Sequence, residues 1–383
     1  GNNDDYFHVG NVEQFLSFIN NTATCSENVV SGNNKPEITM DIPENLTIPI
    51  ATPFELDASA IDPDGDALTY NWEQMDTGPI SQLGNPMGGA PSFRSYPPSP
   101  ESKRLFPRLN FITGGIGSNK EVLPLYNRNL NFRFTVRDNH PGAGITVWED
   151  LRLRTDDSAG PFRVTSQTSI TFAEVGSTLD VEWDVANTDN EVIDCQEVDI
   201  YLSLDGGRNF EILLADNVPN NGLASVKLPN NLTNDGKIKV KASNNVFFQL
   251  NRSTIIIREP SAPGFFIDVE NSEYDVCLPN QVEIAVNGTS FQEFDTPIEL
   301  DLITALPEGA SYSFSDNPIA TDGSTTLLID LTEVENTQSF TFTLEGSAEN
   351  AASIQQEVTF HVTGTSFDDL ELLSPSNGIS GLD

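Results

Sequence analysis

The feature that most limits the fold of this chain is a series of short runs in which apolar and polar residues alternate. Three of these runs lie in the first half of the chain, at residues 54–58, 68–73 and 130–136. A period of two places every second side chain on one face, as in a β-strand with one buried face. Turn residues separate the runs, so we expect strands that fold back on one another.

The same pattern continues along the chain and divides it into modules. Further β-type runs occupy residues 179–185, 198–202, 237–241, 282–286, 339–344 and 358–362. Two segments rich in Ser, Ala, Pro and Gly, at residues 158–161 and 259–264, are typical of domain boundaries. The sequence therefore predicts an all-β protein of tandem immunoglobulin-like β-sandwiches of about 100 residues each. These modules are expected over residues 35–157, 158–260 and 261–363.

One short helix is expected near the N-terminus. Asn11 followed by Gln14 matches a capping box in which Asn replaces Ser or Thr. The apolar residues after Asn11 fall on one helical face, which predicts a helix from Val12 to Asn20: Val12, Phe15, Leu16 and Ile19. A helix this short is marginal alone in water, so its apolar face needs a partner.

The first module contains a long insertion, residues 76–129, that is rich in Pro and Gly. A loop of this length inside a compact domain is either functional or disordered. It carries a basic cluster on an otherwise acidic chain: Arg94, Lys103, Arg104 and Arg108, with Lys120 further on. Loops on a sandwich are where such folds place binding. We therefore expect these four residues, Arg94 to Arg108, to contact an acidic partner.

The charge of the chain restricts its partners and its location. It has 57 Asp and Glu against 19 Lys and Arg, a formal net charge of −38, and residues 259–383 contain no Lys or Arg. Such a protein repels phosphate backbones and anionic lipid, which excludes nucleic-acid binding and peripheral membrane binding. No apolar run approaches the roughly 18 residues that span a bilayer. The acidity favours a secreted or bacterial cell-surface location, although an acidic surface that serves only solubility is the simpler alternative.

A cluster of carboxylates is the sharpest local motif. Asp62-Pro63-Asp64-Gly65-Asp66 places three carboxylates two residues apart, and Asp138 at the end of another predicted strand could add a fourth. Calcium takes six to eight oxygen ligands, so Asp62, Asp64, Asp66 and Asp138 form a predicted calcium site. The alternative is a turn in which Asp and Gly are favoured for backbone reasons alone.

Residues for catalysis are not found. The three histidines, His8, His140 and His361, are far apart, and none belongs to a His-Glu-x-x-His motif. The chain also lacks a Gly-x-Ser-x-Gly elbow, a P-loop and a dinucleotide fingerprint. Trp72 and Trp183 are better interpreted as core than as a carbohydrate-stacking surface. No catalytic residue is predicted.

Many segments share one resemblance: residues 5–19, 54–70, 91–98, 130–138, 159–166, 181–186, 202–207 and 238–240. They resemble the non-catalytic region of secreted bacterial zinc metalloproteases of the reprolysin-like metzincin type. Residues 306–310, 314–318 and 323–327 look like bacterial extracellular immunoglobulin-like repeats. Nearly the whole chain is similar to the C-terminal region of such proteases.

The resemblance implies several properties. Residues 1–34 would be the last helix of a protease domain plus a linker, and residues 364–383 a linker to a further domain. The family's zinc motif would precede Gly1 and is absent here, so zinc is expected only in that separate catalytic domain. In secreted proteins of related bacteria Asp-Ser-Ala is an O-glycan acceptor, which makes Ser158 in Asp157-Ser158-Ala159 a candidate glycosylation site.

These observations favour a non-catalytic accessory or adhesive region of a secreted or cell-surface protein. It would act in spacing and in binding an extracellular protein, a matrix or a polysaccharide, and calcium would stiffen it. One alternative is a structural adhesin or surface-fibre subunit that self-associates through exposed strand edges. Another is a part of an active metalloendopeptidase whose catalytic domain is a separate piece.

Overall fold

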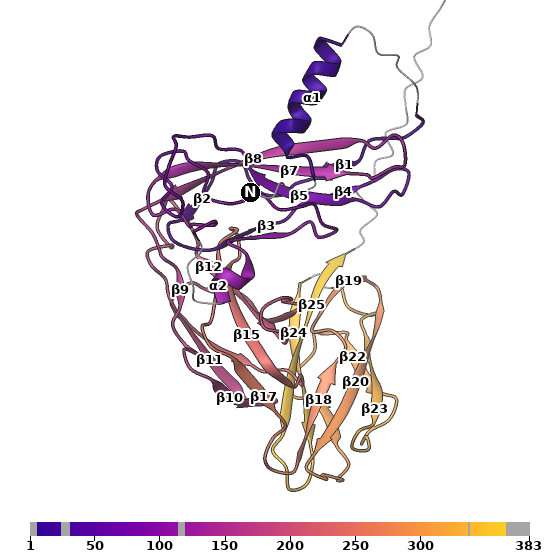
Figure 1. The fold of residues 1–383 in the computed structure, drawn as a ribbon. Coiled ribbons are helices and arrows are strands. Elements are labelled where there is room, and N and C mark those ends of the chain that lie inside the picture. Colours follow the sequence, from indigo (N-terminus) through magenta and orange to yellow (C-terminus); the bar gives the residue numbers. More distant parts are fainter. Residues whose placement is uncertain (1–5, 24–30, 114–118, 336–337, 365–383) are drawn as a thin grey trace, which may run out of the picture. The chain divides into compact units, whose positions relative to one another are not determined.

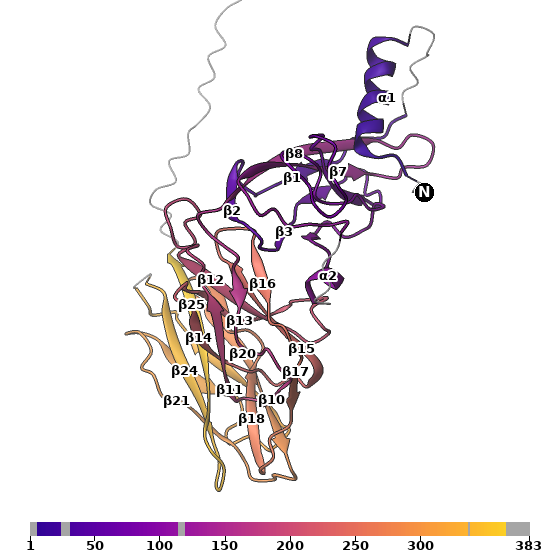
Figure 2. The same ribbon diagram turned by 60° about the vertical axis from the view of Figure 1, so that its left-hand side comes forward.

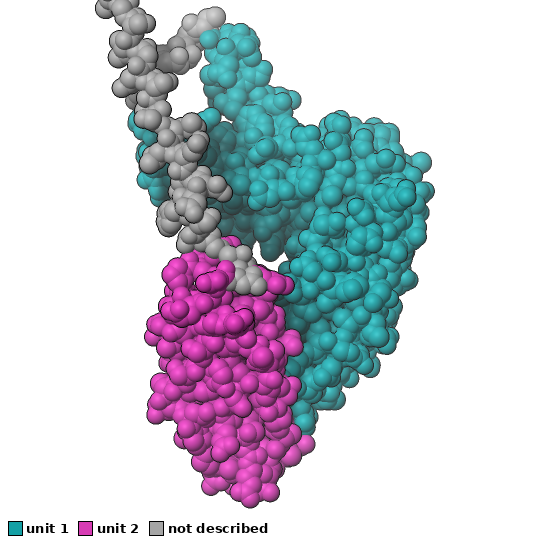
Figure 3. Space-filling model, turned by 180° about the vertical axis from the view of Figure 1, so that it is seen from behind, with its two compact units in different colours: residues 1–258 teal, residues 259–383 magenta. Residues whose placement is uncertain are grey.

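The computed structural model describes residues 6–23, 31–113, 119–335 and 338–364. The chain divides into two compact units, residues 1–258 and residues 259–383 (Figure 3). Unit 1 contains two modules, and unit 2 contains one. The expected linker at residues 364–383 lies outside the described residues except for Gly364.

The first module of unit 1 is built around a four-stranded sheet (Figure 1). Its strands run in the order β2 (Leu46–Pro49), β8 (Thr146–Asp156), β7 (Arg128–Arg137) and β5 (Thr69–Gln74). Two smaller sheets complete the module: β1 (Glu37–Thr39) with β4 (Ser59–Ile61), and β3 (Phe54–Leu56) with β6 (Arg104–Phe106). The core is aromatic, because Phe54, Phe106 and Phe132 are buried and their ring centroids lie within 6 Å of one another.

The second module of unit 1 has two sheets. One contains β10 (Thr171–Glu174), β17 (Ile255–Arg258), β15 (Thr233–Ala242), β12 (Glu197–Ser203) and β13 (Ile212–Pro219), with β16 (Phe248–Leu250) also paired to β15. The other contains β14 (Leu223–Lys227), β11 (Thr178–Asp184) and β9 (Arg163–Val164). In β11 buried and exposed residues alternate strictly, as its period-two sequence predicts.

Unit 2 is a sandwich of two four-stranded sheets. One has the order β18 (Gly264–Val269), β20 (Gln281–Phe291), β23 (Ser324–Asp330) and β22 (Ser311–Phe314). The other has the order β19 (Glu273–Leu278), β25 (Ile354–Gly364), β24 (Phe340–Ser347) and β21 (Glu299–Leu302). Alternate side chains of both sheets form one apolar core that includes Ile284, Leu327, Phe342 and Phe360.

The all-β, immunoglobulin-like fold class is thus confirmed. Each of the runs predicted as a strand overlaps a strand of the structure, and Trp72 and Trp183 are buried as predicted. The insertion at residues 76–129 contains β6 and a short helix, α2 (Leu109–Thr113), which the sequence did not reveal. Among the described residues, no helix is both long and apolar enough to cross a membrane.

The N-terminal helix exists, but its predicted start and cap are wrong. Helix α1 covers Val9–Asn21, and His8 at its N-cap makes no side-chain capping hydrogen bond. The cap comes instead from the first module, where the buried Glu73 carboxylate accepts a hydrogen bond from the Val9 N–H at 3.0 Å. The other Glu73 oxygen lies 2.9 Å from His8 Nδ1. Asn11 and Gln14 are therefore not needed as a capping box.

Helix α1 is held to the module by polar contacts, while most of its apolar face is exposed. Arg133 of β7 pairs with Glu13 at 3.2 Å, and only Val9 of the helix is buried. Phe15 and Phe18 remain 64% and 56% exposed. Unit 1 therefore does not cover the apolar face of the helix, for which the sequence predicted a partner.

A buried ion pair joins the two modules of unit 1. Glu55 of β3 is 4% exposed, and its carboxylate lies 3.2 Å from Lys239 Nζ and 2.7 Å from Lys241 Nζ, both on β15. The Glu55 N–H also donates to the Val246 carbonyl at 2.9 Å. Burial by itself raises the pKa of Glu55, but the charges of the two lysines outweigh it and lower this pKa to about 2. The modules are therefore tied together by a charged group that neither module can satisfy alone.

Candidate functional site

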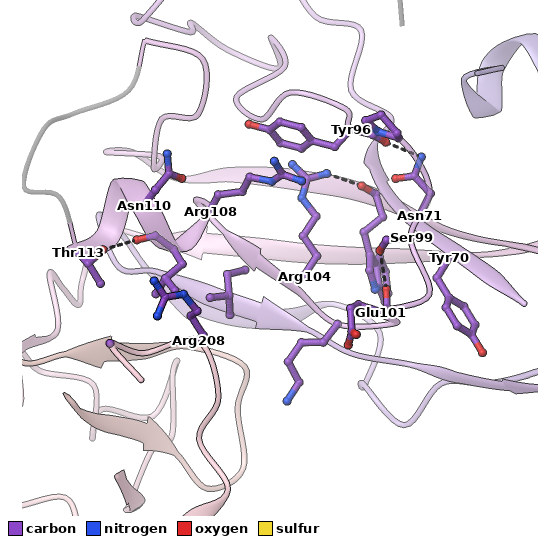
Figure 4. A pocket seen from close by; sticks show the side chains of 16 residues that line it. Tyr70, Asn71, Tyr96, Ser99, Glu101, Arg104, Arg108, Asn110, Thr113 and Arg208 are labelled. Carbon is purple, nitrogen blue, oxygen red and sulfur yellow. Dashed lines mark hydrogen bonds between the residues drawn. The ribbon is translucent and has the colours of Figure 1, made fainter. Parts of the chain in front are cut away.

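A cavity of about 570 Å³ lies where the two modules of unit 1 meet. Its wall comes from β5, from the insertion with β6 and α2, and from the loop between β12 and β13. Helix α2 lies against that loop (Figures 1 and 2), since a side chain on Gly207 would contact Leu109. The lining combines apolar surface with basic and polar side chains (Figure 4), and the latter include Tyr70, Tyr96, Glu101, Lys103, Arg104, Arg108, Asn110, Thr113 and Arg208. Binding sites commonly occupy such junctions between domains.

Two guanidinium groups lie over one aromatic ring in this cavity. The Arg108 guanidinium carbon is 3.4 Å from the centroid of the Tyr96 ring, and that of Arg104 is 5.0 Å from it. Arg104 is held on its other side by Glu121 at 2.8 Å. Burial lowers the pKa of Arg104, Glu121 opposes that shift, and the positive charge of Arg108 adds to it. The two arginines thus repel each other, and only Arg104 has a carboxylate partner among the described residues.

The structure separates the four basic residues that the sequence grouped as a partner-binding set. Lys103, Arg104 and Arg108 line the cavity, whereas Arg94 lines a neighbouring cavity of about 710 Å³ together with Lys120. The Arg104 side chain is only 11% exposed and donates to the carbonyls of Trp72 and Arg94. Its role is therefore to build the wall. Lys103 pairs with Asp57 at 3.6 Å, and Arg108 is exposed.

Sequence reasoning missed the part of the cavity that comes from the second module. Gly206 and Gly207 both have positive φ, as in a tight turn, but the sequence did not connect Arg208, directly after this turn, to the basic insertion. Arg208 is exposed and lines the same cavity. Glu101 was also overlooked, although it lies in the same Pro-rich segment as Arg104. The only sequence signal that could have assigned Arg208 to the site was its position as a basic residue next to a turn.

The predicted calcium ligands form a second cluster, in the turn between β4 and β5. Asp62, Asp64 and Asp66 each offer a carboxylate oxygen, and these atoms lie within 4.8 Å of one another. Asp62 Oδ1 accepts from the backbone N–H groups of Asp64 and Asp66, which is the Asx-turn geometry. Asp62 Oδ2 is buried and accepts no hydrogen bond from the part of the chain that the structure describes. The turn alternative therefore explains one oxygen of Asp62 and leaves the other unexplained.

Neighbouring groups hold the other carboxylates of this cluster. Asn34 donates to Asp64 from its backbone and from its side chain, and these bonds lower the pKa of Asp64. His140 Nδ1 lies 2.7 Å from Asp66 Oδ2, and this hydrogen bond raises the pKa of His140. Asp138 is not part of the three-carboxylate group. Its buried side chain accepts from His140 N, Ile145 N and Asn33 Nδ2, so it orders the adjacent loop.

The candidate glycosylation site lies on the surface at the junction of the modules. Ser158 is exposed, and its Oγ accepts a hydrogen bond from Asn190 Nδ2 at 3.1 Å. Asp156 accepts from the Ser158 backbone N–H at 3.0 Å. A modifying enzyme would reach the hydroxyl without unfolding either module, at the cost of the contact to Asn190.

Comparisons with known proteins identify no family. No protein-family model matches the chain, and no curated protein matches it. Among solved structures, the tandem Ig repeats of Dlar are 12% identical and cover 59% of this chain and 98% of theirs, with a TM-score of 0.31. Drosophila N-cadherin EC1-4 is 9% identical over 85% of this chain and 74% of its own, with a TM-score of 0.20. Domains 4 and 5 of the S-layer protein SbsC are 13% identical over 35% of this chain and 67% of their own, with a TM-score of 0.19.

Proposed function

We propose that this chain is a non-catalytic binding region of a secreted or cell-surface protein, and that unit 1 binds an anionic extracellular partner in the cavity between its modules. The observation that carries the proposal is Arg108. Its guanidinium is exposed, stacks on Tyr96 and has no ion-pair partner among the described residues. In a chain where acids outnumber bases three to one, most exposed cations should find a carboxylate.

An anion in the cavity would relieve an unfavourable arrangement. Arg108 is repelled by Arg104 and lines the same cavity as Lys103 and Arg208. A carboxylate or sulfate bound between these groups would offset their repulsion and accept charge-assisted hydrogen bonds. The buried ion pair at Glu55 holds both sides of the cavity in place, so little ordering would accompany binding.

The test is retention of the full chain on an immobilised carboxylated polymer. We expect Arg108→Ala to reduce binding about tenfold, as for the loss of one charge-assisted contact. Arg163→Ala, which removes the same charge from an exposed site outside the cavity, should leave binding unchanged. Equal behaviour of the two variants would show that the cavity is not the binding site.

Calcium bound at Asp62, Asp64 and Asp66 would be a second element of this function. Three carboxylates suit a hard cation, and a bound ion would contact the buried Asp62 Oδ2, for which the described residues supply no hydrogen-bond donor. Water would complete the coordination. The cluster follows β4 and precedes β5, so the ion would stiffen the first module at the end of its main sheet.

The attachment of this region to a zinc metalloprotease is proposed from the sequence resemblance alone. In that arrangement the region would position a separate catalytic domain near its substrate, and Ser158 would carry an O-glycan. Intact mass of natively secreted protein tests the glycan, and a zinc-containing fragment that co-purifies with the chain would support the protease.

Self-association as an adhesin is the second candidate function, and the open sheets of unit 2 favour it. Strands β18, β22, β19 and β21 are sheet edges, which can pair with strands of another chain. Sedimentation of the full chain over a wide concentration range tests this function. A monomer at every concentration would remove it.

A further inference from the structure

We propose that the cavity between the modules of unit 1 binds a uronic-acid unit of an acidic polysaccharide. This inference rests on the proposed function, because it names the anion that the same cavity would take.

The cation of the site is accessible to a carboxylate. The Arg108 guanidinium carbon lies 3.4 Å from the centroid of the Tyr96 ring, and because Arg108 is exposed, the N–H donors of its planar fork can reach a ligand. Two parallel N–H groups match the two oxygens of a carboxylate. Glu121 is committed to Arg104 and to the Arg108 backbone N–H, at 2.7 Å, so it does not occupy this position. The free edge of Arg108 thus provides one bidentate contact.

The cavity lining also contains a group that an acidic peptide would not satisfy. Glu101 is exposed, and its carboxylate has no hydrogen-bond or ion-pair partner among the described residues. A carboxylate accepts hydrogen bonds and repels other carboxylates. A ligand made of acidic side chains would therefore be repelled by Glu101 while Arg108 attracted it. A sugar that carries one carboxylate and several hydroxyl donors can satisfy both residues.

The remaining lining supports a ligand with hydroxyl groups. The exposed Asn110 side chain has no hydrogen bond among the described residues and offers both a donor and an acceptor. The Tyr70 ring stacks on Phe134 with an interplanar angle of 9°, which fixes its orientation in the cavity wall (Figure 4). At about 570 Å³ the cavity lies within the range of roughly 300 to 1,000 Å³ typical of small-ligand sites.

The experiment compares three probes on the full chain by calorimetric titration: a methyl galacturonoside, which carries one carboxylate, its methyl ester, and a tri-glutamate peptide. We expect the uronate to bind at least tenfold more tightly than the other two. Arg108→Ala should remove this preference and Arg163→Ala should not. Tryptophan fluorescence of each variant confirms that unit 1 remains folded, and Arg108→Lys, which keeps the charge without the fork, should lose most of the affinity.

Glu101→Ala separates the inference from the proposed function, because its expected effects on the two anions have opposite signs. It should weaken binding of the uronate severalfold and strengthen binding of the peptide. If the peptide binds as tightly as the uronate and Glu101→Ala strengthens both, the cavity is a general anion site, and the inference fails while the proposed function stands. If neither anion binds, or Arg108→Ala and Arg163→Ala behave alike, both fail.

Discussion

The two units of this chain have similar folds but opposite uses of charge. Unit 1 contains all 19 Lys and Arg together with 34 Asp and Glu, whereas unit 2 has 23 acidic residues and no Lys or Arg. In unit 1, charged side chains such as Glu55, Glu73 and Arg128 are buried. Among the described residues of unit 2, Thr325 is the only buried polar residue, and it is uncharged.

The difference shows what a sandwich can build when cations are present. A buried carboxylate is stable only if a cation or several donors compensate it. Unit 2 has no Lys or Arg for this purpose, so its core is apolar and its carboxylates belong to the surface. Unit 1 can bury acids between its modules, and the resulting joint frames a cavity. The proposed binding site is therefore a consequence of where the cations lie.

Among the substitutions that test this comparison, the largest loss of stability is expected from one in the apolar core of unit 2. Phe342 is fully buried against Phe360, with ring centroids 5.6 Å apart, so Phe342→Ala should destabilise unit 2 by about 3–5 kcal/mol. All three tryptophans, Trp72, Trp148 and Trp183, lie in unit 1 and report only on its unfolding. The calorimetric transition of unit 2 should fall while the tryptophan transition does not move. A common shift of both would show that the units do not unfold independently.

Removal of the buried Glu55 carboxylate should instead lower the stability of unit 1. Glu55→Gln leaves Lys239 and Lys241 without their partner, so we expect a loss of about 3 kcal/mol from the tryptophan-detected unfolding of unit 1 in urea. Glu283→Gln, at an exposed position of unit 2, is the matched control and should change stability by less than about 0.5 kcal/mol. A small effect of Glu55→Gln would mean that the modules are held together by their apolar contacts alone.

The acid dependence of unit 1 follows from the same group. The folded pKa of Glu55 is about 2, below its ordinary value of 4.5, so its contribution is complete above pH 4.5 and is lost as the pH falls toward 2. This pKa shift corresponds to about 3 kcal/mol of unfolding free energy from the ion pair between the modules. Unit 2 has no Lys or Arg with which a carboxylate could pair, so it should lose less stability than unit 1 over this pH range. Thermal scans from pH 7 to 2, repeated with Glu55→Gln, measure both trends, and an unchanged acid profile in that variant would contradict the assignment.

The smallest predicted effect on stability is that of calcium. It tests whether the clustered carboxylates of unit 1 bind the ion and an isolated carboxylate of unit 2 does not. Millimolar calcium at a Kd of roughly 0.1 to 1 mM should stabilise unit 1 by about 1 kcal/mol, and Asp64→Asn should abolish this gain. Asp322→Asn, at an acidic position of unit 2 outside any described carboxylate cluster, is the control. A calcium response that survives Asp64→Asn would exclude the turn at residues 62–66 as the site.

The fold was predictable because strand periodicity is a local property. The runs at residues 179–185 and 198–202 coincide closely with β11 and β12, and Trp72 and Trp183 took their predicted places in the core. The start of α1 was predicted wrongly, because a buried side chain 64 residues away, Glu73, replaces the local cap at Val9. The partner-binding set was predicted only in part, because Arg104 is bound to Glu121 and Arg94 lies in another cavity.

The sequence by itself determined the all-β modules, the closely spaced carboxylates of residues 62–66, and the absence of Lys and Arg from residues 259–383. Each of these depends on neighbouring residues or on composition. Only the tertiary structure decided that Glu55 would be buried beside Lys239, 184 residues away, and that Arg208 would line a cavity with Arg108. The physical reason is that burial and charge compensation depend on distances in space, which the alternation of side chains along a strand does not encode.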